Sequence, residues 1–188
     1  HVWGWMGGSG HRADPASIPA HPWLSDDSWD HERGYLAVEA NYLMLHENLM
    51  DLTHFSYLQA GIIGTKQYAE APFDVQLDGA TVRISRLLRD DVLPEFYAGP
   101  MGLNGIRVER ASDSFFLTPG FQIAHSTVTA PSISRSDTGR VFRTTLLHAI
   151  TPAGRDGTHY FWAVARDYEA GNRLVSRIAG ESCKTAPQ

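Results

Sequence analysis

The strongest constraint on the fold is a pair of alternating apolar and polar runs joined by an Asp-Gly dipeptide. The runs are Phe73–Asp78 and Ala80–Leu87, and they meet at Asp78-Gly79. Alternation places successive side chains on opposite faces of a strand, and Asp-Gly supplies the positive φ that a tight hairpin turn requires. This stretch therefore predicts two antiparallel strands.

Further runs of strand type follow the hairpin until near the C-terminus. Clusters of Gly and Pro separate them, which is typical of a meander of antiparallel strands. Together with the hairpin they predict one long curved sheet. These runs are Ile106–Glu109, Ser114–Thr118, Phe121–Val128, Arg140–Ile150 and Thr158–Tyr168.

Helical spacing is confined to two segments. Apolar residues recur at intervals of four, three and three from Leu45 onward, which predicts a helix over His46–Leu58. Tyr35–Leu45 before it has the pattern of a strand, and Asn172–Ala179 that of a terminal helix. Helices on one face of an antiparallel sheet make an α+β fold. A curved sheet wrapped around a helix encloses a cavity, which is the default ligand site.

Composition excludes several classes of protein. The chain has 188 residues, 43% hydrophobic and 20% charged, which fits one globular domain. Its net charge of −5 argues against a general nucleic-acid binder. No apolar run approaches the ~18 residues of a membrane span. The lone Cys183 excludes an internal disulfide and fits a reducing cytoplasm, where we expect the protein.

We expect a single catalytic-type domain over residues 1–188. Residues 1–33 form a strand-like start and an irregular arm, with Trp23 and Trp29 as its expected anchors, and residues 34–188 carry the core pattern. The chain opens at His1 and shows no signal-peptide pattern, so we expect a piece of a longer protein.

The residues that carry chemistry lie on the first predicted helix. Asn48, Asp51 and His54 are spaced by three, which places them in one polar row beside the apolar stripe. The common outcome for such a row is exposure to water. The alternative is a metal site facing the cavity, because imidazole binds divalent iron or zinc well and neighbouring carboxylates orient it.

The segment Asn48–His54 (NLMDLTH) resembles the iron-binding segment of Rieske-type non-haem iron oxygenases, in which a second His follows five positions later. The closest likeness is to aromatic O-demethylases of the vanillate and dicamba monooxygenase kind. Two flanking stretches look similar as well. Val2–Gly7 looks like the stretch after the Rieske domain, and His159–Trp162 looks like part of the last long strand.

The resemblance implies a helix-grip (START/Bet v1-like) catalytic domain. It further implies Fe(II) held by two His and one carboxylate, a homotrimer, and electrons from a Rieske [2Fe-2S] domain in a neighbouring subunit or from a reductase. By position, His54 matches the first iron ligand. Asp51 matches the acid that links the Rieske centre to that ligand, and Asn48 matches the polar residue beside the metal.

Three departures from the family pattern stand out. Gln59 occupies the second ligand position, and an amide oxygen is a weaker ligand for ferrous iron than imidazole. Five positions correspond to about 500° of helix, so His54 and Gln59 cannot share a face of an uninterrupted helix. The resemblance implies that the helix ends between them, which Gly61 permits. Glu181 is the nearest match to the third ligand. No Cys-x-His pair exists, so a [2Fe-2S] cluster must come from a missing domain or another chain.

Four further residues are predicted to contact the substrate. His125 and His148 are expected to approach a carboxylate or phenol, and Phe121 and Trp162 to pack on an aromatic ring. For His125, which shares a strand face with Phe121 by period two, a satisfied core position is the commoner outcome.

Two functions compete at this point. The first is O2-dependent O-demethylation or hydroxylation of an aromatic acid at a mononuclear iron. The second is an iron-free relative of the same fold, which either binds an apolar ligand or performs acid–base chemistry with Asp51, His54 and His148. Gln59 keeps the second hypothesis open.

Overall fold

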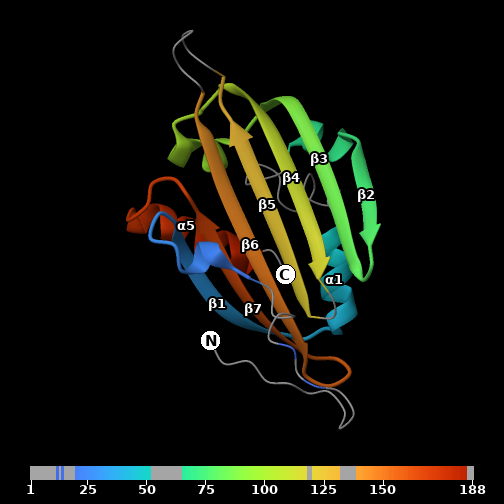
Figure 1. The fold of residues 1–188 in the computed structure, drawn as a ribbon. Helices are drawn as coiled ribbons and strands as arrows, with labels where there is room; N and C mark the ends of the chain where they lie inside the picture. Colours follow the sequence, from blue (N-terminus) through green and yellow to red (C-terminus); the bar gives the residue numbers. More distant parts are fainter. Residues whose placement is uncertain are drawn as a thin grey trace.

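A computed structural model describes Arg12, Asp14 and residues 20–51, 65–117, 120–131 and 139–185. Within these ranges the strands form one antiparallel sheet in the order β1-β7-β6-β5-β4-β3-β2 (Figure 1). The strands are β1 (Asp30–Val38), β2 (Phe73–Asp78), β3 (Thr81–Val92), β4 (Arg107–Leu117), β5 (Phe121–Thr129), β6 (Val141–Pro152) and β7 (Thr158–Arg166).

The helices are short except at the C-terminal end. In Figure 1, α1 and α5 lie behind the sheet, on the same side of it. The helical elements are η2 (Pro22–Leu24), α1 (Tyr42–Met50), α3 (Lys66–Glu70), α4 (Glu95–Ala98), η3 (Gly99–Met101) and α5 (Arg173–Thr185). The predicted α+β architecture is thereby confirmed.

The predicted hairpin is present as β2 and β3. Asp78 pairs with Thr81, and Gly79 has a φ of 58°, the left-handed conformation that glycine adopts without strain. Each later strand candidate is also found, with bounds shifted by one to two residues, and β7 ends at Arg166 where the prediction ran to Tyr168. The run predicted from Ile106 and the run predicted from Ser114 are one continuous strand, β4.

The start of the first helix differs from the prediction. The strand predicted over Tyr35–Leu45 ends at Val38, and α1 begins at Tyr42. Asn41 explains the change, because its side chain accepts a hydrogen bond from the backbone N–H of Leu43 and so caps the helix.

The end of this helix also differs. α1 stops at Met50, and Asp51 takes an extended conformation (φ −76°, ψ 102°). The uninterrupted helix predicted over His46–Leu58 is therefore wrong at Asp51. Residues 52–58 lie outside the described residues.

One hydrophobic core joins the sheet to α1 and α5. Leu45 from α1 and Cys183 from α5 pack against Tyr160, Trp162 and Val164 of β7. Because these strand residues alternate, the face that they form is the face covered by both helices. The terminal helix predicted over Asn172–Ala179 is confirmed as α5, and Asn172 accepts from the backbone N–H groups of Leu174 and Val175.

The N-terminal arm lies against the other face of the sheet. Trp23 in η2 is buried, as predicted for an anchor, and Trp29 is half-buried. The ring of His21 lies 6.3 Å from that of Phe121 on β5. Among the described helices, none combines the length and apolar character that crossing a bilayer would take.

The packing of Trp162 leads to a prediction at Gly34. These residues are paired across β1 and β7, and a Cβ at Gly34 would lie 2.5 Å from Trp162 Cε2. We expect Gly34→Ala to lower the free energy of unfolding by about 1–3 kcal/mol through overpacking. Gly99→Ala is the control, because a Cβ there meets nothing within 4 Å. Urea denaturation compares the two, and equal effects would contradict the packing described.

Candidate functional site

A cavity of about 190 Å³ lies between the covered face of the sheet and the helices α1 and α5. We call it the inner cavity. Strands β4 to β7 supply its wall, with hydroxyl groups toward one end and apolar groups in the middle. The helices contribute Asn48, Leu49, Ile178, Ala179 and Cys183. A concave apolar site with few polar groups is the usual form of a small-molecule site.

His148 lines the inner cavity, as a substrate-contacting residue must. Its Nδ1 lies 2.7 Å from the hydroxyl of Tyr160, and the two rings stack. Burial raises the pKa of Tyr160, so this hydroxyl keeps its proton. Burial, with a smaller contribution from His46, lowers the pKa of His148 to about 4. The imidazole is therefore neutral at physiological pH, and it shares one hydrogen bond with the Tyr160 hydroxyl.

A second buried histidine lies on α1. The side-chain amide of Gln122 donates to His46 Nδ1 at 2.9 Å and to the His46 carbonyl oxygen at 3.2 Å. Gln122 is also the register partner of His148. These contacts hold α1 on the sheet beside the cavity, with His46 Nδ1 as a hydrogen-bond acceptor.

The predicted polar row is only partly described. Asn48 is half-buried and lines the inner cavity. Asp51 is exposed just beyond the end of α1, where it interacts electrostatically with Arg86. His54 and Gln59 lie outside the described residues.

The predicted third ligand is placed on α5. Glu181 is exposed, whereas the cavity-lining residues of α5 are Val175, Ile178, Ala179 and Cys183. Within the described parts of the chain, no group of three His, Cys, Asp or Glu side chains is arranged to hold a metal ion. The described residues therefore do not form a metal site by themselves, and the role of Glu181 stays a prediction.

The ring of His125 lies on the other face of the sheet. β5 borders the inner cavity at this residue, but His125 Nδ1 is 2.9 Å from the Thr145 hydroxyl and the ring packs edge-on against Phe115. His125, Thr145 and Asp113 are register partners, so they share a face. Burial lowers the pKa of His125, against the opposing effect of Asp113. These contacts favour the satisfied structural position over contact with a ligand in the inner cavity.

Phe121 and Trp162 border a different hollow. A cavity of about 640 Å³ on the uncovered face of the sheet, the outer cavity, includes both residues together with His21, Tyr35 and Phe161. Phe121 is two residues from Ile123 and four from His125, on the same face. Trp162 packs in the core under the helices and reaches the outer cavity across Gly34. The four predicted substrate residues thus do not surround one pocket, and their roles stay predictions.

The sequence analysis missed the polar end of the inner cavity. It left a gap between the two runs that form β4, and that gap contains Arg110 and Ser112. Both line the inner cavity together with Ser114, and all three alternate along one strand face. Period-two alternation continued through 110–114 was the signal that points to them.

Residues 38–186 match the family described as the vanillate O-demethylase oxygenase C-terminal domain. The chain belongs to this family. The predicted membership of the Rieske oxygenase catalytic domains is thereby confirmed.

Curated relatives agree with this membership. The chain is 29% identical over 184 residues to a vanillate O-demethylase oxygenase subunit of Pseudomonas sp. (strain HR199), covering 94% of this chain and 52% of that protein. It is 26% identical over 184 residues to the toluene-4-sulfonate monooxygenase system iron-sulfur subunit TsaM1 of Comamonas testosteroni, covering 93% and 52%. The chain thus spans about half the length of these relatives.

The fold of this vanillate demethylase-type domain is shared with dicamba monooxygenase. The crystal structure of that protein bound to 3,6-dichlorosalicylic acid has a TM-score of 0.81 and 20% identity, and the likeness covers 93% of this chain and 50% of that one. The helix-grip fold that the resemblance implied is therefore confirmed.

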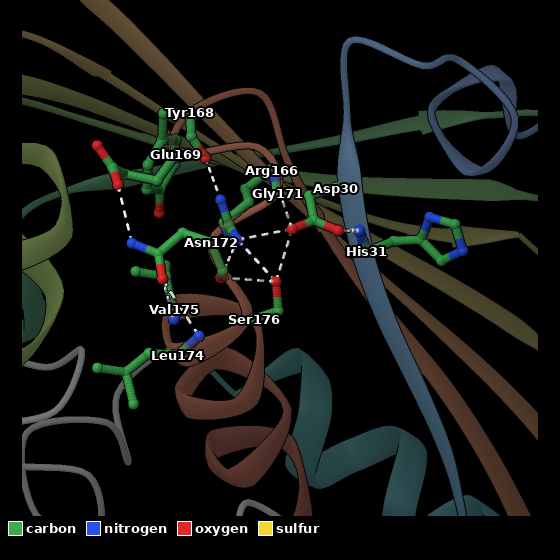
Figure 2. Close-up of polar contacts among 10 residues, drawn as sticks. All are labelled: Asp30, His31, Arg166, Tyr168, Glu169, Gly171, Asn172, Leu174, Val175 and Ser176. Carbon is green, nitrogen blue, oxygen red and sulfur yellow. Dashed lines mark hydrogen bonds and ion pairs between the residues drawn. The ribbon is translucent and has the colours of Figure 1, made fainter.

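A buried polar network fixes α5 of this domain to the sheet (Figure 2). Arg166 at the end of β7 donates to the Asp30 carboxylate at 2.9 Å and to the Ser176 hydroxyl at 2.7 Å, and it also bonds the Tyr168 carbonyl oxygen. Ser176 Oγ donates to the same Asp30 oxygen at 2.7 Å. β1 near the N-terminus therefore meets β7 and α5 of the C-terminal part at one carboxylate.

The first prediction for the site concerns this carboxylate. Burial acts to raise the pKa of Asp30, but the Ser176 hydrogen bond and the Arg166 charge outweigh it and hold the pKa below its usual value. The stabilisation is therefore present at neutral pH and is lost as the pH falls through the lowered pKa. We expect Asp30→Asn to cost about 2–4 kcal/mol, because it leaves Arg166 buried without its counter-charge.

The control for Asp30 is an exposed pair of similar geometry. Arg107 and Asp90 lie 2.6 Å apart, with 66% and 63% of their side chains exposed. Asp90→Asn should cost less than about 1 kcal/mol. Urea unfolding at pH 7 measures both variants, and similar losses would show that the network does not stabilise α5.

The second prediction for the site concerns His148. Its pKa is about 4 in the folded chain and 6.5 in an unfolded chain. Between these two pH values the unfolded chain binds a proton at this residue and the folded chain does not. The free energy of unfolding should therefore fall by up to roughly 3 kcal/mol as pH drops from 6.5 toward 4. His148→Gln should remove this part of the dependence, whereas exposed His159→Gln should retain it. Identical pH profiles of the two variants in urea unfolding would contradict the placement of His148.

Proposed function

We propose that the chain is the catalytic domain of a Rieske-type aromatic oxygenase. The proposed reaction is O2-dependent O-demethylation or hydroxylation of a single-ring aromatic acid. The observation that carries the proposal is the inner cavity, within a domain whose family is that of vanillate O-demethylase oxygenases. An apolar cavity of about 150 Å³ accommodates benzene, so about 190 Å³ suits one substituted ring.

The names of the relatives support the substrate class. They refer to vanillate, toluene-4-sulfonate and dicamba, which are aromatic anions. In this chain, Leu146, Val164 and Ile178 offer an apolar contact surface, and neutral His148 lies at one side of it. A ring can stay dry in such a site while its polar substituents meet the few polar groups.

Iron is the proposed cofactor. His54 and Gln59, which follow Asp51 in the sequence, would hold it together with Glu181 of α5. When bound, ferrous iron would activate O2 for insertion into the substrate. A dicamba monooxygenase structure is described with non-haem iron, which supports the type of metal. This chain's part is to enclose the ring, exclude water and present neutral His148 to it.

The electrons must come from outside this chain. We propose a Rieske [2Fe-2S] domain or a reductase as donor, a homotrimer as the assembly, and Asp51 as the link toward the donor. The exposure of Asp51 directly after the end of α1 supports this role, because a donor domain can reach it there. We also propose that the protein works in the cytoplasm, where the buried Cys183 stays a thiol.

Metal content tests the proposal. After anaerobic reconstitution of the full-length protein with ferrous iron, we expect close to one mononuclear iron per chain. His54→Ala should abolish it, while His159→Ala, an exposed control, should retain it. Gln59→His should tighten iron binding by at least tenfold, since imidazole replaces a weak amide ligand.

The competing function is an iron-free ligand-binding protein of the same fold, which Gln59 favours. Absence of mononuclear iron in both the wild type and Gln59→His would support it and overturn the oxygenase. A general-acid role for His148 is disfavoured, because its lowered pKa leaves no cationic ring to donate a proton at neutral pH.

A further inference from the structure

We infer that Ser112 and Arg110 form a recognition point for the anionic substituent of the aromatic ligand, at the end of the inner cavity remote from Tyr160. The inference rests on the proposed function only for the identity of the ring. That the bound substituent is an anion is inferred from the side chains that surround it. The substituent that fits is a carboxylate or a sulfonate.

The first observation is a row of polar residues across the covered face of the sheet. Residues paired directly in an antiparallel ladder share a face, and one such row crosses β3 to β7. Its hydroxyl members line the inner cavity, and an arginine stands at each end. In order, the row is Arg86, Ser112, Ser126, Thr144 and Arg166.

The second observation is that one hydroxyl of this row lacks a partner. Ser126 Oγ accepts from the hydroxyl of Tyr97 at 2.9 Å, and Thr144 Oγ1 is 3.2 Å from that of Tyr168. Ser112 is 7% exposed and therefore 93% buried. Its Oγ has no hydrogen-bond partner among the described residues. A buried hydroxyl without a partner is unfavourable unless a ligand completes it.

The third observation is the charge beside this hydroxyl. Arg110 is buried, lines the inner cavity two residues from Ser112, and stacks on the rings of Tyr68 and Tyr97. Arg86, the register partner of Ser112, is also buried and stacks on Tyr68. Two buried cations therefore flank the Tyr68 ring.

The donors of Arg86 are the second feature that points to an anion. Asp91 is fully buried, with Oδ2 3.6 Å from Arg110 Nη1. Asp51 interacts with Arg86 from its exposed position beyond α1. Arg86 Nε and Nη2 are buried without hydrogen-bond partners among the described residues. Buried guanidinium donors beside a buried hydroxyl favour an anionic ligand over a neutral one.

The next row of the sheet explains why the anion belongs to a ring. Ser114, Ala124, Leu146 and Val164 are register partners, adjacent to the polar row and mostly apolar. His148 and Gln122 follow in the row after that. A ring over the apolar row would place one substituent at Ser112 and the opposite one toward His148.

Ligand binding tests this inference without any need for turnover. The full-length protein is titrated calorimetrically with benzoate, with benzenesulfonate and with uncharged benzyl alcohol. We expect both anions to bind more tightly than the alcohol. Ser112→Ala should weaken benzoate binding by about tenfold, since a hydrogen bond to a charged group is lost, and change the alcohol's affinity less than about twofold.

Ser114→Ala is the matched control. Ser114 lines the same cavity from the same strand face but lies in the apolar row, so its loss should leave the anion preference unchanged. Arg110→Lys keeps the charge and should weaken both anions, with the same small effect on the alcohol. Because Ser112 Oγ makes no hydrogen bond to the described residues, we expect Ser112→Ala to keep its urea midpoint, so that a loss of binding does not report unfolding.

The outcomes are separable. The anion site would be overturned if Ser112→Ala lowered the affinities for benzoate and benzyl alcohol equally. It would also be overturned if Ser112→Ala and Ser114→Ala lowered the affinity for benzoate equally. Benzoate binding that depends on Ser112 in a protein without iron would uphold the anion site while the oxygenase fails. Tighter binding of benzenesulfonate than of benzoate would uphold the anion site and identify a sulfonate as its preferred substituent.

Discussion

The register of the antiparallel ladder is the constraint on which the rest of this domain depends. Each paired position fixes the face of its neighbours, so a single register aligns Ser112, Ser126 and Thr144 under the helices and Phe115 and His125 away from them. A slip of one residue on any strand would exchange the two faces. The hollow under α1 and α5, the polar row and the apolar row all follow from this arrangement.

The covered face carries an uneven distribution of polarity. Its centre packs Leu45, Tyr160 and Val164 into a core, whereas its margins contain buried charge at Asp30 with Arg166 and at Asp91 with Arg110. Hydrogen bonds from three elements satisfy the Asp30 carboxylate, so that network stabilises the fold. Near Ser112, by contrast, Arg86 Nε and Nη2 have no hydrogen-bond partners among the described residues, which is the condition under which a polar ligand is bound rather than excluded.

The strands were predictable because their signal is local. Alternation and the Asp78-Gly79 turn identify β2 and β3 within Phe73–Leu87, and the later runs needed only small changes of their bounds. The boundary between β1 and α1 was not predictable from apolar spacing, because a single side chain, Asn41, ends one pattern and begins the other through a hydrogen bond to Leu43. The resemblance to the oxygenase family lay in the motif Asn48–His54, which is also local, and the family match over residues 38–186 confirmed it.

The sequence by itself determined the antiparallel sheet, the two helical segments and the family, since each depends on residues close together in the chain. Only the tertiary structure decided that His148 meets the inner cavity while the ring of His125 turns to the other face. It also decided that Arg86 and Ser112, 26 positions apart in number, are neighbours on one face. Such pairings depend on how distant strands hydrogen-bond to one another, and side-chain spacing along one strand contains no record of its partner.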